Sequence, residues 1–154
     1  MEKERIYIAS DHAGFELKEK IKKILAENCL VEDLGAYEFD KEDDYPDYAI
    51  KLCKEVLRKN SKGILICGSA HGINIAANKF PGIRATICWN EKSAEYAKSH
   101  TDVNVICIPA RIISEKETEK IIVIWLKTKF ENAERHNRRL EKIKALEKEY
   151  TKKF

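Results

Sequence analysis

A thiol, a hydroxyl and two glycines stand together in the stretch CGSAHG (residues 67–72), directly after the apolar run 63–66. A helix that begins here would turn unpaired amides and the positive end of its dipole towards the sulfur of Cys67, which favours a thiolate. Gly68 and Gly72 let the backbone approach a ligand closely, and Ser69 adds a hydroxyl donor. The stretch therefore predicts a base or nucleophile beside a group of donors, with a buried cysteine in a glycine-rich turn as the structural alternative.

Two further sets of polar residues could complete such a site. Asp11 and His12 directly follow the apolar run 5–10, and Arg135 and Arg139 stand four residues apart. Residues four apart share one face of a helix, so the two arginines could hold a phosphate, although a solvated basic helix carries the same pattern. The four histidines (12, 71, 100 and 136) lie in polar segments or on the charged last helix, outside the apolar faces. The spacing of these residues indicates no zinc site.

Several known motifs are absent from the sequence. A cysteine phosphatase loop needs an arginine six residues after its cysteine, and that position is Ile73. The fingerprints of dinucleotide-binding and P-loop proteins are missing as well. The five cysteines form no C-x-x-C pair, so neither a disulfide framework nor a zinc site is expected, and the four other than Cys67 are interpreted as core residues.

The elements that must position these residues alternate between strand and helix five times. Strands are expected at 5–10, 30–34, 64–67, 85–89 and 103–108, and helices at about 15–27, after Tyr45-Pro46, at 73–80, from Asn90 to about 99, at 114–130 and at 134–152. The continuously apolar middle strands predict an α/β fold: a doubly wound, Rossmann-like, five-stranded parallel sheet with helices on both faces and a charged C-terminal helix. Ligands of such sheets bind at the carboxyl ends of the strands, where Asp11, Cys67 and Arg111 would lie. The acidic stretch 38–44 is expected to be a surface loop.

Length and charge narrow the function further. The 154 residues fit a single domain, residues 1–154. The net charge of +3 is local, because the last 21 residues hold eight basic and four acidic side chains. One basic helix without interleaved aromatic residues does not predict a nucleic-acid partner. The longest apolar run, 121–126, is too short to span a membrane, and the N-terminus has no apolar signal region, so a cytoplasmic location is expected.

Taken together, the motifs resemble the B-type ribose-5-phosphate isomerases and their relatives that isomerise galactose 6-phosphate or allose 6-phosphate. The resemblance covers nearly the whole chain. It is carried by Ser10–Gly14, Asp44–Pro46, 63–68, 72–79, 82–85, His100, Asp102-x-Asn104-Val105 and Arg135-His-x-x-Arg139. One branch of the family has a glutamate where this chain has Ile73, and isoleucine cannot take a proton, so the chain is similar to the branch that uses a thiol.

The resemblance implies an aldose–ketose isomerase that works through an enediolate, which requires one base and an oxyanion pocket. It implies that Cys67 is the base and that Ser69 and the amides from Gly68 to Gly72 hold the enediolate oxygen. It also implies a dimer or a dimer of dimers with shared sites, to which the neighbouring chain contributes His100 and Arg111, and neither a metal nor an organic cofactor. The further implied roles are ring opening, by His100 and Asp11, and contact with the substrate or its phosphate, by His12, Tyr45, Arg111, Arg135 and Arg139.

The chain departs from the family pattern near the expected site. Thr101 stands where the family commonly has asparagine, Ser69 replaces the commoner threonine, and His71 occupies a turn that usually holds a small or apolar residue. These departures leave the sugar open. A ribose 5-phosphate isomerase is the leading hypothesis, with a six-carbon sugar-phosphate isomerase as the alternative and a non-catalytic sugar-phosphate-binding module as a less favoured one.

Overall fold

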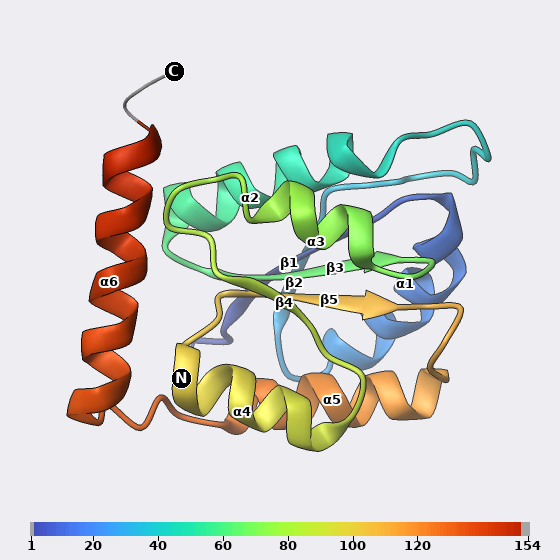
Figure 1. Cartoon of the computed structure of the whole chain (residues 1–154). Helices are drawn as coiled ribbons and strands as arrows, with labels where there is room; N and C mark the ends of the chain where they lie inside the picture. Colours follow the sequence, from blue (N-terminus) through green and yellow to red (C-terminus); the bar gives the residue numbers. More distant parts are fainter. Residues whose placement is uncertain (1, 152–154) are drawn as a thin grey trace.

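Residues 2–151, the part of the chain that the computed structural model describes, contain five parallel strands in the order β2-β1-β3-β5-β4 (Figure 1). Their bounds are β1 (Arg5–Ser10), β2 (Leu30–Asp33), β3 (Lys62–Cys67), β4 (Ala85–Ile87) and β5 (Val105–Pro109). From the central pair β1 and β3, the chain adds β2 on one side of the sheet and β5 and β4 on the other. This change of direction is typical of a doubly wound sheet. The predicted fold class is confirmed.

Helices cover both faces of the sheet (Figure 1). Their bounds are α1 (His12–Leu25), α2 (Tyr45–Lys59), α3 (His71–Ala77), α4 (Glu91–Thr101), α5 (Glu115–Lys127) and α6 (Glu134–Thr151). One core joins α1, α4 and α5 to the sheet, and the other joins α2 and α3 to its opposite face. The charged helix α6 stands beside these layers and is mostly exposed. Within the described part of the chain, no helix has both the length and the apolar character needed to cross a membrane.

The central strands are apolar throughout because both of their faces are covered. Along β1, Ile6 and Ile8 point into one core while Tyr7 and Ala9 point into the other, and all four are at most 1% exposed. The four cysteines other than Cys67 (29, 53, 88 and 107) are buried in the same two cores, as expected. Because helices pack on both faces of the sheet, the ends of its strands have fixed positions. The candidate site residues directly follow these strand ends.

The two helices nearest the candidate site, α1 and α3, begin earlier in the chain than the sequence predicted. The side chain of Asp11 accepts a hydrogen bond from the Gly14 amide, so α1 begins at His12, directly after β1, and not near residue 15. Likewise α3 begins at His71, immediately beyond the glycine-rich turn. The predicted caps of α4 and α5 are confirmed as capping boxes at Asn90 and Ser114, although α5 ends at Lys127, before Phe130.

Candidate active site

The carboxyl edge of the sheet brings together the ends of β1, β3 and β5. In the strand register, Ser10 lies opposite Ile66, and Cys67 lies opposite Pro109. The residues that follow these strands therefore meet at one edge, as the sequence predicted for Asp11, His12, Cys67 and Arg111.

Cys67 and Asp11 contact each other at this edge. The Cys67 Sγ lies 3.1 Å from Asp11 Oδ2, and the two residues are 7% and 4% exposed. Since an ionised carboxylate can only accept, the thiol donates its proton towards Asp11. The other oxygen, Oδ1, accepts from the Gly14 amide at 3.1 Å. The carboxylate is thus fixed between the first turn of α1 and the sulfur.

The electrostatics of Cys67 correct one expectation. The pKa of the Cys67 thiol is raised to about 12, mostly by burial and then by the hydrogen bond to Asp11 and the negative charge of Asp11. The amides of Gly68 and Ala70 lower the pKa but do not outweigh these effects. A thiolate was expected from the helix N-terminus alone. The structure instead holds a protonated thiol, because the sulfur is desolvated beside an acid.

The turn between β3 and α3 directs its backbone towards the sulfur. Ala70 adopts a left-handed conformation with φ 66° and ψ −2°, which is uncommon for a residue with a side chain. This conformation turns the chain sharply, and the amides of Gly68 and Ala70 both act on Cys67. Ser69 is exposed at the open side of the turn. The arrangement provides several donors in a small space, as an oxyanion pocket requires.

Both glycines of the turn are in close contact with side chains from other elements. A Cβ at Gly72 would lie 2.2 Å from Cζ of Tyr45, and a Cβ at Gly68 would lie 2.9 Å from Nη1 of Arg111. The Tyr45 ring, which is 39% exposed, and the Arg111 guanidinium therefore lie directly against the turn. The Arg111 amide also donates to the Gly68 carbonyl at 3.0 Å. Arg111 thus lies beside the turn that follows Cys67 in its own chain, and its supply by a neighbouring chain, which the resemblance implies, stays a prediction.

His12 joins this group through a partner that the sequence did not indicate. Its backbone amide and its Nδ1 lie 3.0 and 2.6 Å from the same oxygen, Oδ1 of Asp43. The Asp43 side chain is only 7% exposed, although it lies in the stretch 38–44 that was expected to be a surface loop. A hollow of about 670 Å³ opens beside His12 and is also lined by Phe39 and Arg111. The two predicted phosphate contacts, His12 and Arg111, therefore face one space.

A buried lysine supports the strand end that carries Asp11. Lys18 is fully buried, and its Nζ donates to both oxygens of Asp33, at 2.7 and 2.8 Å, and to the Ala36 carbonyl at 2.6 Å. The segment it holds bonds in turn to Ser10, whose amide donates to the Gly35 carbonyl at 2.8 Å. The residue before Asp11 is thereby tied to the segment that follows β2 as well as to β3.

The remaining candidate residues form a second group on α4 and α6. The His100 ring stacks between Tyr96 and His136, with centroid distances of 4.8 and 4.6 Å. Nε2 of His136 lies 3.0 Å from Glu131, which also pairs with Arg135 at 3.4 Å. His136 is only 5% exposed, although the sequence places it on the charged last helix, outside the apolar faces. The stacked rings lie at the junction between the two helices.

This second group lies at the other end of the sheet from Cys67. His100 is in the last turn of α4, which ends at Thr101, a few residues before β5 begins at Val105. Cys67 is level with Pro109, the last residue of β5. At about 3.3 Å per residue, the two positions are separated by roughly 13 Å along the strand direction. Within one chain, the structure does not bring His100, Arg135 or Arg139 to Cys67.

Two sets of side chains have the atom types and the closeness that a metal ion needs. Within residues 2–151 these are His100, Glu131 and His136, and Asp11, His12 and Asp43, with ligand atoms within 4.8 Å of one another in each set. In both sets an imidazole nitrogen already pairs with a carboxylate oxygen, as His12 does with Asp43 and His136 with Glu131. In the second set, the other oxygen of Asp43, Oδ2, is buried without a hydrogen-bond partner among the described residues.

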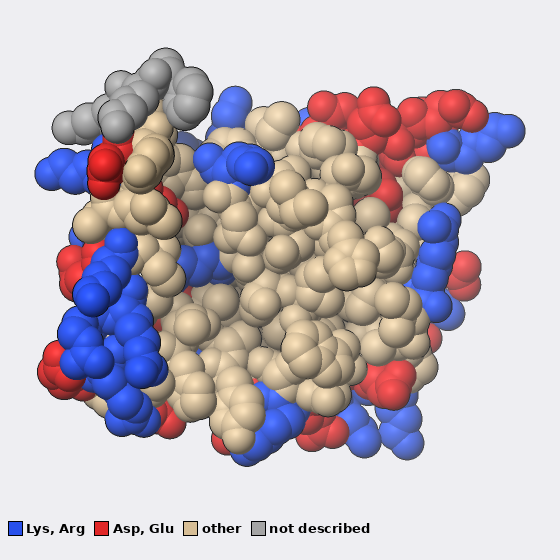
Figure 2. Space-filling model, in the orientation of Figure 1, with Lys and Arg blue, Asp and Glu red and all other residues tan. Residues whose placement is uncertain are grey.

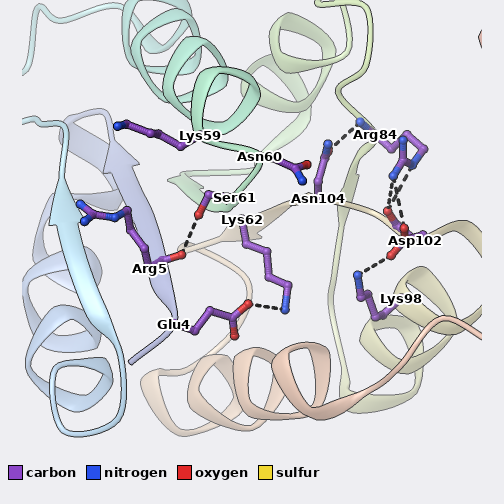
Figure 3. Close-up of a pocket in the computed structure, with 10 residues that line it drawn as sticks. All are labelled: Glu4, Arg5, Lys59, Asn60, Ser61, Lys62, Arg84, Lys98, Asp102 and Asn104. Carbon is purple, nitrogen blue, oxygen red and sulfur yellow. Dashed lines mark hydrogen bonds and ion pairs between the residues drawn. The ribbon is translucent and has the colours of Figure 1, made fainter. Parts of the chain in front are cut away.

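A polar hollow of about 420 Å³ lies at the amino edge, where β1, β3 and β5 begin (Figure 3). It is rich in cations, but Lys62 pairs with Glu4, while Arg84 and Lys98 both pair with Asp102 (Figure 3). The Arg84 guanidinium also donates to the Asp102 carbonyl at the end of α4. These contacts neutralise charge and cap a helix, so the hollow is a structural feature apart from the predicted site.

The fold and the carboxyl-edge group together define an α/β protein that binds a small ligand outside the ends of its parallel strands. Comparison with known proteins narrows this class. The chain belongs to the ribose/galactose isomerase family, whose model matches residues 6–143.

Relatives within the family are similar over almost their whole length. A probable ribose-5-phosphate isomerase B of Mycoplasma pneumoniae is 46% identical over 146 residues, which cover 94% of this chain and 95% of the relative. Ribose-5-phosphate isomerase B of Escherichia coli is 39% identical, with 93% and 96% covered. The crystal structure of ribose-5-phosphate isomerase B from Mycoplasma genitalium with bound ribulose 5-phosphate is 40% identical and covers 97% of this chain and 99% of that one, with a TM-score of 0.91.

Proposed function

We propose that this chain is an aldose–ketose isomerase that interconverts ribose 5-phosphate and ribulose 5-phosphate. The observation that carries the proposal is the contact between Cys67 Sγ and Asp11 Oδ2, 3.1 Å apart, beside the inward-turned amides of Gly68 and Ala70. A proton acceptor next to a cluster of donors is what an enediolate intermediate requires. The family relatives that act on ribose 5-phosphate support the choice of substrate.

The proposed chemistry moves one proton between neighbouring carbons of the open sugar. The resting thiol passes its proton to the Asp11 carboxylate, and the sulfur then takes the proton from the carbon next to the carbonyl. The negative charge that develops on the substrate oxygen accepts hydrogen bonds from Ser69 and from the amides between Gly68 and Gly72. The sulfur then returns its proton to the adjacent carbon, and the neighbouring hydroxyl proton moves to the oxygen that carried the negative charge. Asp11 finally returns its proton to the sulfur, which restores the resting thiol. These steps need neither a metal ion nor an organic cofactor.

The sugar phosphate is held by groups on both sides of the sulfur in this proposal. His12 and Arg111 line one hollow and are proposed to bind the phosphate, and Tyr45 lies against Gly72. His100, with Asp11, is proposed to open the sugar ring. Arg135 and Arg139, on one face of α6, are proposed to add phosphate contacts.

These last assignments require two chains, because His100, Arg135 and Arg139 lie far from Cys67 of their own chain. We therefore propose a homodimer, alone or paired into a dimer of dimers, in which each site combines the carboxyl edge of one chain with α4 and α6 of the other. Figure 2 shows a broad face without charged side chains next to α6, over the region of α3, β4 and α4 in Figure 1. Ile75, Trp89 and Tyr96, on or next to these helices, are each about half exposed. An apolar face of this kind suits a subunit interface. A cytoplasmic location stays a prediction from the sequence.

The test is to incubate the purified protein with ribose 5-phosphate, allose 6-phosphate and galactose 6-phosphate in parallel and to follow ketose formation. Turnover is expected with ribose 5-phosphate, and Cys67→Ala should lower kcat by about 10²- to 10⁴-fold, the usual share of a general base. Cys29→Ala removes another buried thiol, outside the site, and should leave kcat unchanged. Unchanged turnover in Cys67→Ala would rule out the sulfur as base. Preference for a six-carbon substrate would favour a six-carbon sugar-phosphate isomerase. Binding without turnover would favour a non-catalytic sugar-phosphate-binding module.

A further inference from the structure

We infer that Asp43 is a positioning residue that fixes the orientation and the protonated nitrogen of His12. Both the backbone amide and Nδ1 of His12 lie within hydrogen-bond distance of Asp43 Oδ1, at 3.0 and 2.6 Å. These two contacts tie the ring to its own backbone through one oxygen atom. The ring is thereby held in a single orientation at the first residue of α1.

The chemistry of the pair determines which nitrogen faces the ligand. An ionised carboxylate has no proton to donate, so the short contact places a proton on Nδ1. Nε2 is then the nitrogen left to meet a ligand in the hollow that His12 shares with Arg111. The ring of Phe39 packs edge-on against His12, with a centroid distance of 6.1 Å and an angle of 89°. The imidazole is therefore held by a carboxylate at one nitrogen and by an aromatic ring beside it.

Asp43 itself is held by the structure around it. Its side chain is only 7% exposed, and a carboxylate is costly to bury unless donors surround it. Its backbone amide donates to the Asp40 carbonyl at 3.1 Å. Tyr48, on α2, faces it as well: burial raises the pKa of the Tyr48 hydroxyl to about 12, with a hydrogen bond to Asp43 and the charge of Asp43 as the next causes. Groups from α1 and α2 thus meet at one carboxylate.

The neighbouring acid provides a matched control. Asp44 is exposed, and its side chain makes no capping hydrogen bond to α2 even though it occupies the cap position. Asp43→Ala and Asp44→Ala remove the same group, with the same charge, from adjacent positions of one loop. A difference between the two variants therefore reports the contact with His12 and not the loss of a negative charge near the site.

The first measurement is independent of any activity. The ¹⁵N chemical shifts of the His12 ring, assigned by their loss in His12→Gln, distinguish the two neutral forms of imidazole. The unchanged protein and Asp44→Ala should show the proton on Nδ1, and Asp43→Ala should show a mixture or the proton on Nε2. Asp43→Asn keeps an acceptor oxygen and should retain the Nδ1 proton with a shifted resonance. A His12 spectrum that is the same in both Asp43 variants as in the unchanged protein would overturn the inference.

The second measurement is kinetic and rests on the proposed function, in which His12 binds the substrate phosphate. Asp43→Ala is expected to raise KM for ribose 5-phosphate about tenfold, as loss of a residue that orients a ligating histidine does, with kcat nearly unchanged. Asp43→Asn should recover most of that loss, and Asp44→Ala should show the original KM. An unchanged KM in Asp43→Ala, or an equal rise in Asp44→Ala, would contradict the positioning role. If ribose 5-phosphate is not turned over at all, the proposed function fails, while the ring spectrum still decides the role of Asp43.

Discussion

The two ends of the sheet carry different kinds of functional residue. At the carboxyl edge, Cys67 and Asp11 are at most 7% exposed and are fixed by the backbone of strands and turns. At the amino end, His100 and Arg135 lie on α4 and α6, with side chains 38% and 55% exposed. The first group is complete in its geometry within one chain, whereas the second presents its polar atoms outwards.

This difference indicates that, in the proposed site, the base is on the buried strand end and the residues for ring opening and phosphate binding are on the exposed helices. A base with a strongly raised pKa must be held rigidly beside its proton acceptor, and the end of a buried strand provides such a place. Residues that open the ring and hold the phosphate must also let the substrate enter, so exposed helices suit them. The three predictions below test this division, starting with the largest expected effect.

The strongest test mixes two inactive chains. Cys67→Ala and His100→Ala should each lower kcat by about 10²- to 10⁴-fold, because each removes one proton-transferring group. If the site is shared, unfolding and refolding the two variants together should restore about a quarter of the original rate. Half of the dimers are then mixed, and each mixed dimer contains one intact site out of two. Mixing without unfolding serves as the control for exchange of chains.

The result that contradicts a shared site is equally clear. Refolded mixtures that stay as inactive as their parents, although they form mixed dimers by mass spectrometry, would show that His100 of one chain does not complete the site that contains Cys67 of the other. The grouping of Arg135 and Arg139 with that site would then lose its basis as well.

A smaller effect is expected from Gly68→Ala, which tests whether Arg111 serves its own chain. The new Cβ would lie 2.9 Å from Nη1 of Arg111, and the end of that flexible side chain can move away at little cost in stability. Loss of one charged hydrogen bond to the phosphate should raise KM about tenfold with little change in kcat. In an Arg111→Ala background the same substitution should have almost no further effect on KM. Independent, additive changes would show that the two residues do not act together.

The smallest effect concerns the pKa of Cys67 in Asp11→Asn. The carboxylate raises this pKa by its charge and as an acceptor for the thiol, so its removal should lower the pKa from about 12. The pKa should stay above its ordinary value, because burial is the largest cause and remains. The pH dependence of alkylation, followed for each cysteine peptide by mass spectrometry, measures the change. Cys53 is an internal control, since burial alone raises its pKa to about 12.

Most of the fold follows from sequence patterns that act locally. Continuous apolar strands, helical spacing of apolar residues and caps at Asn90 and Ser114 depend on neighbours within a few positions, and these features are confirmed. The common edge of Asp11 and Cys67 follows from the parallel topology, because all the strands then end on one side. Such features are encoded in short stretches and in a single topological rule.

The features that the sequence did not predict depend on contacts between distant residues. Asp43 lies in a polar loop and looks solvated, yet it bonds to His12 across 31 positions of the chain. The helix dipole at Cys67 is visible in the sequence, whereas the burial and the acid that outweigh it are properties of the packed structure. His136 sits on a highly charged helix and is buried only because α6 meets His100 on α4. In each case tertiary contact reverses what local composition indicates.

The separation of Cys67 from His100 has a consequence for how the protein would behave at low concentration. If each chain carries only half of every site, a lone subunit has no complete one, and specific activity must fall on dilution below the dissociation constant of the dimer. A sugar phosphate or an inhibitor that contacts both halves would slow this dissociation by mass action, so the substrate would help to hold its own enzyme together.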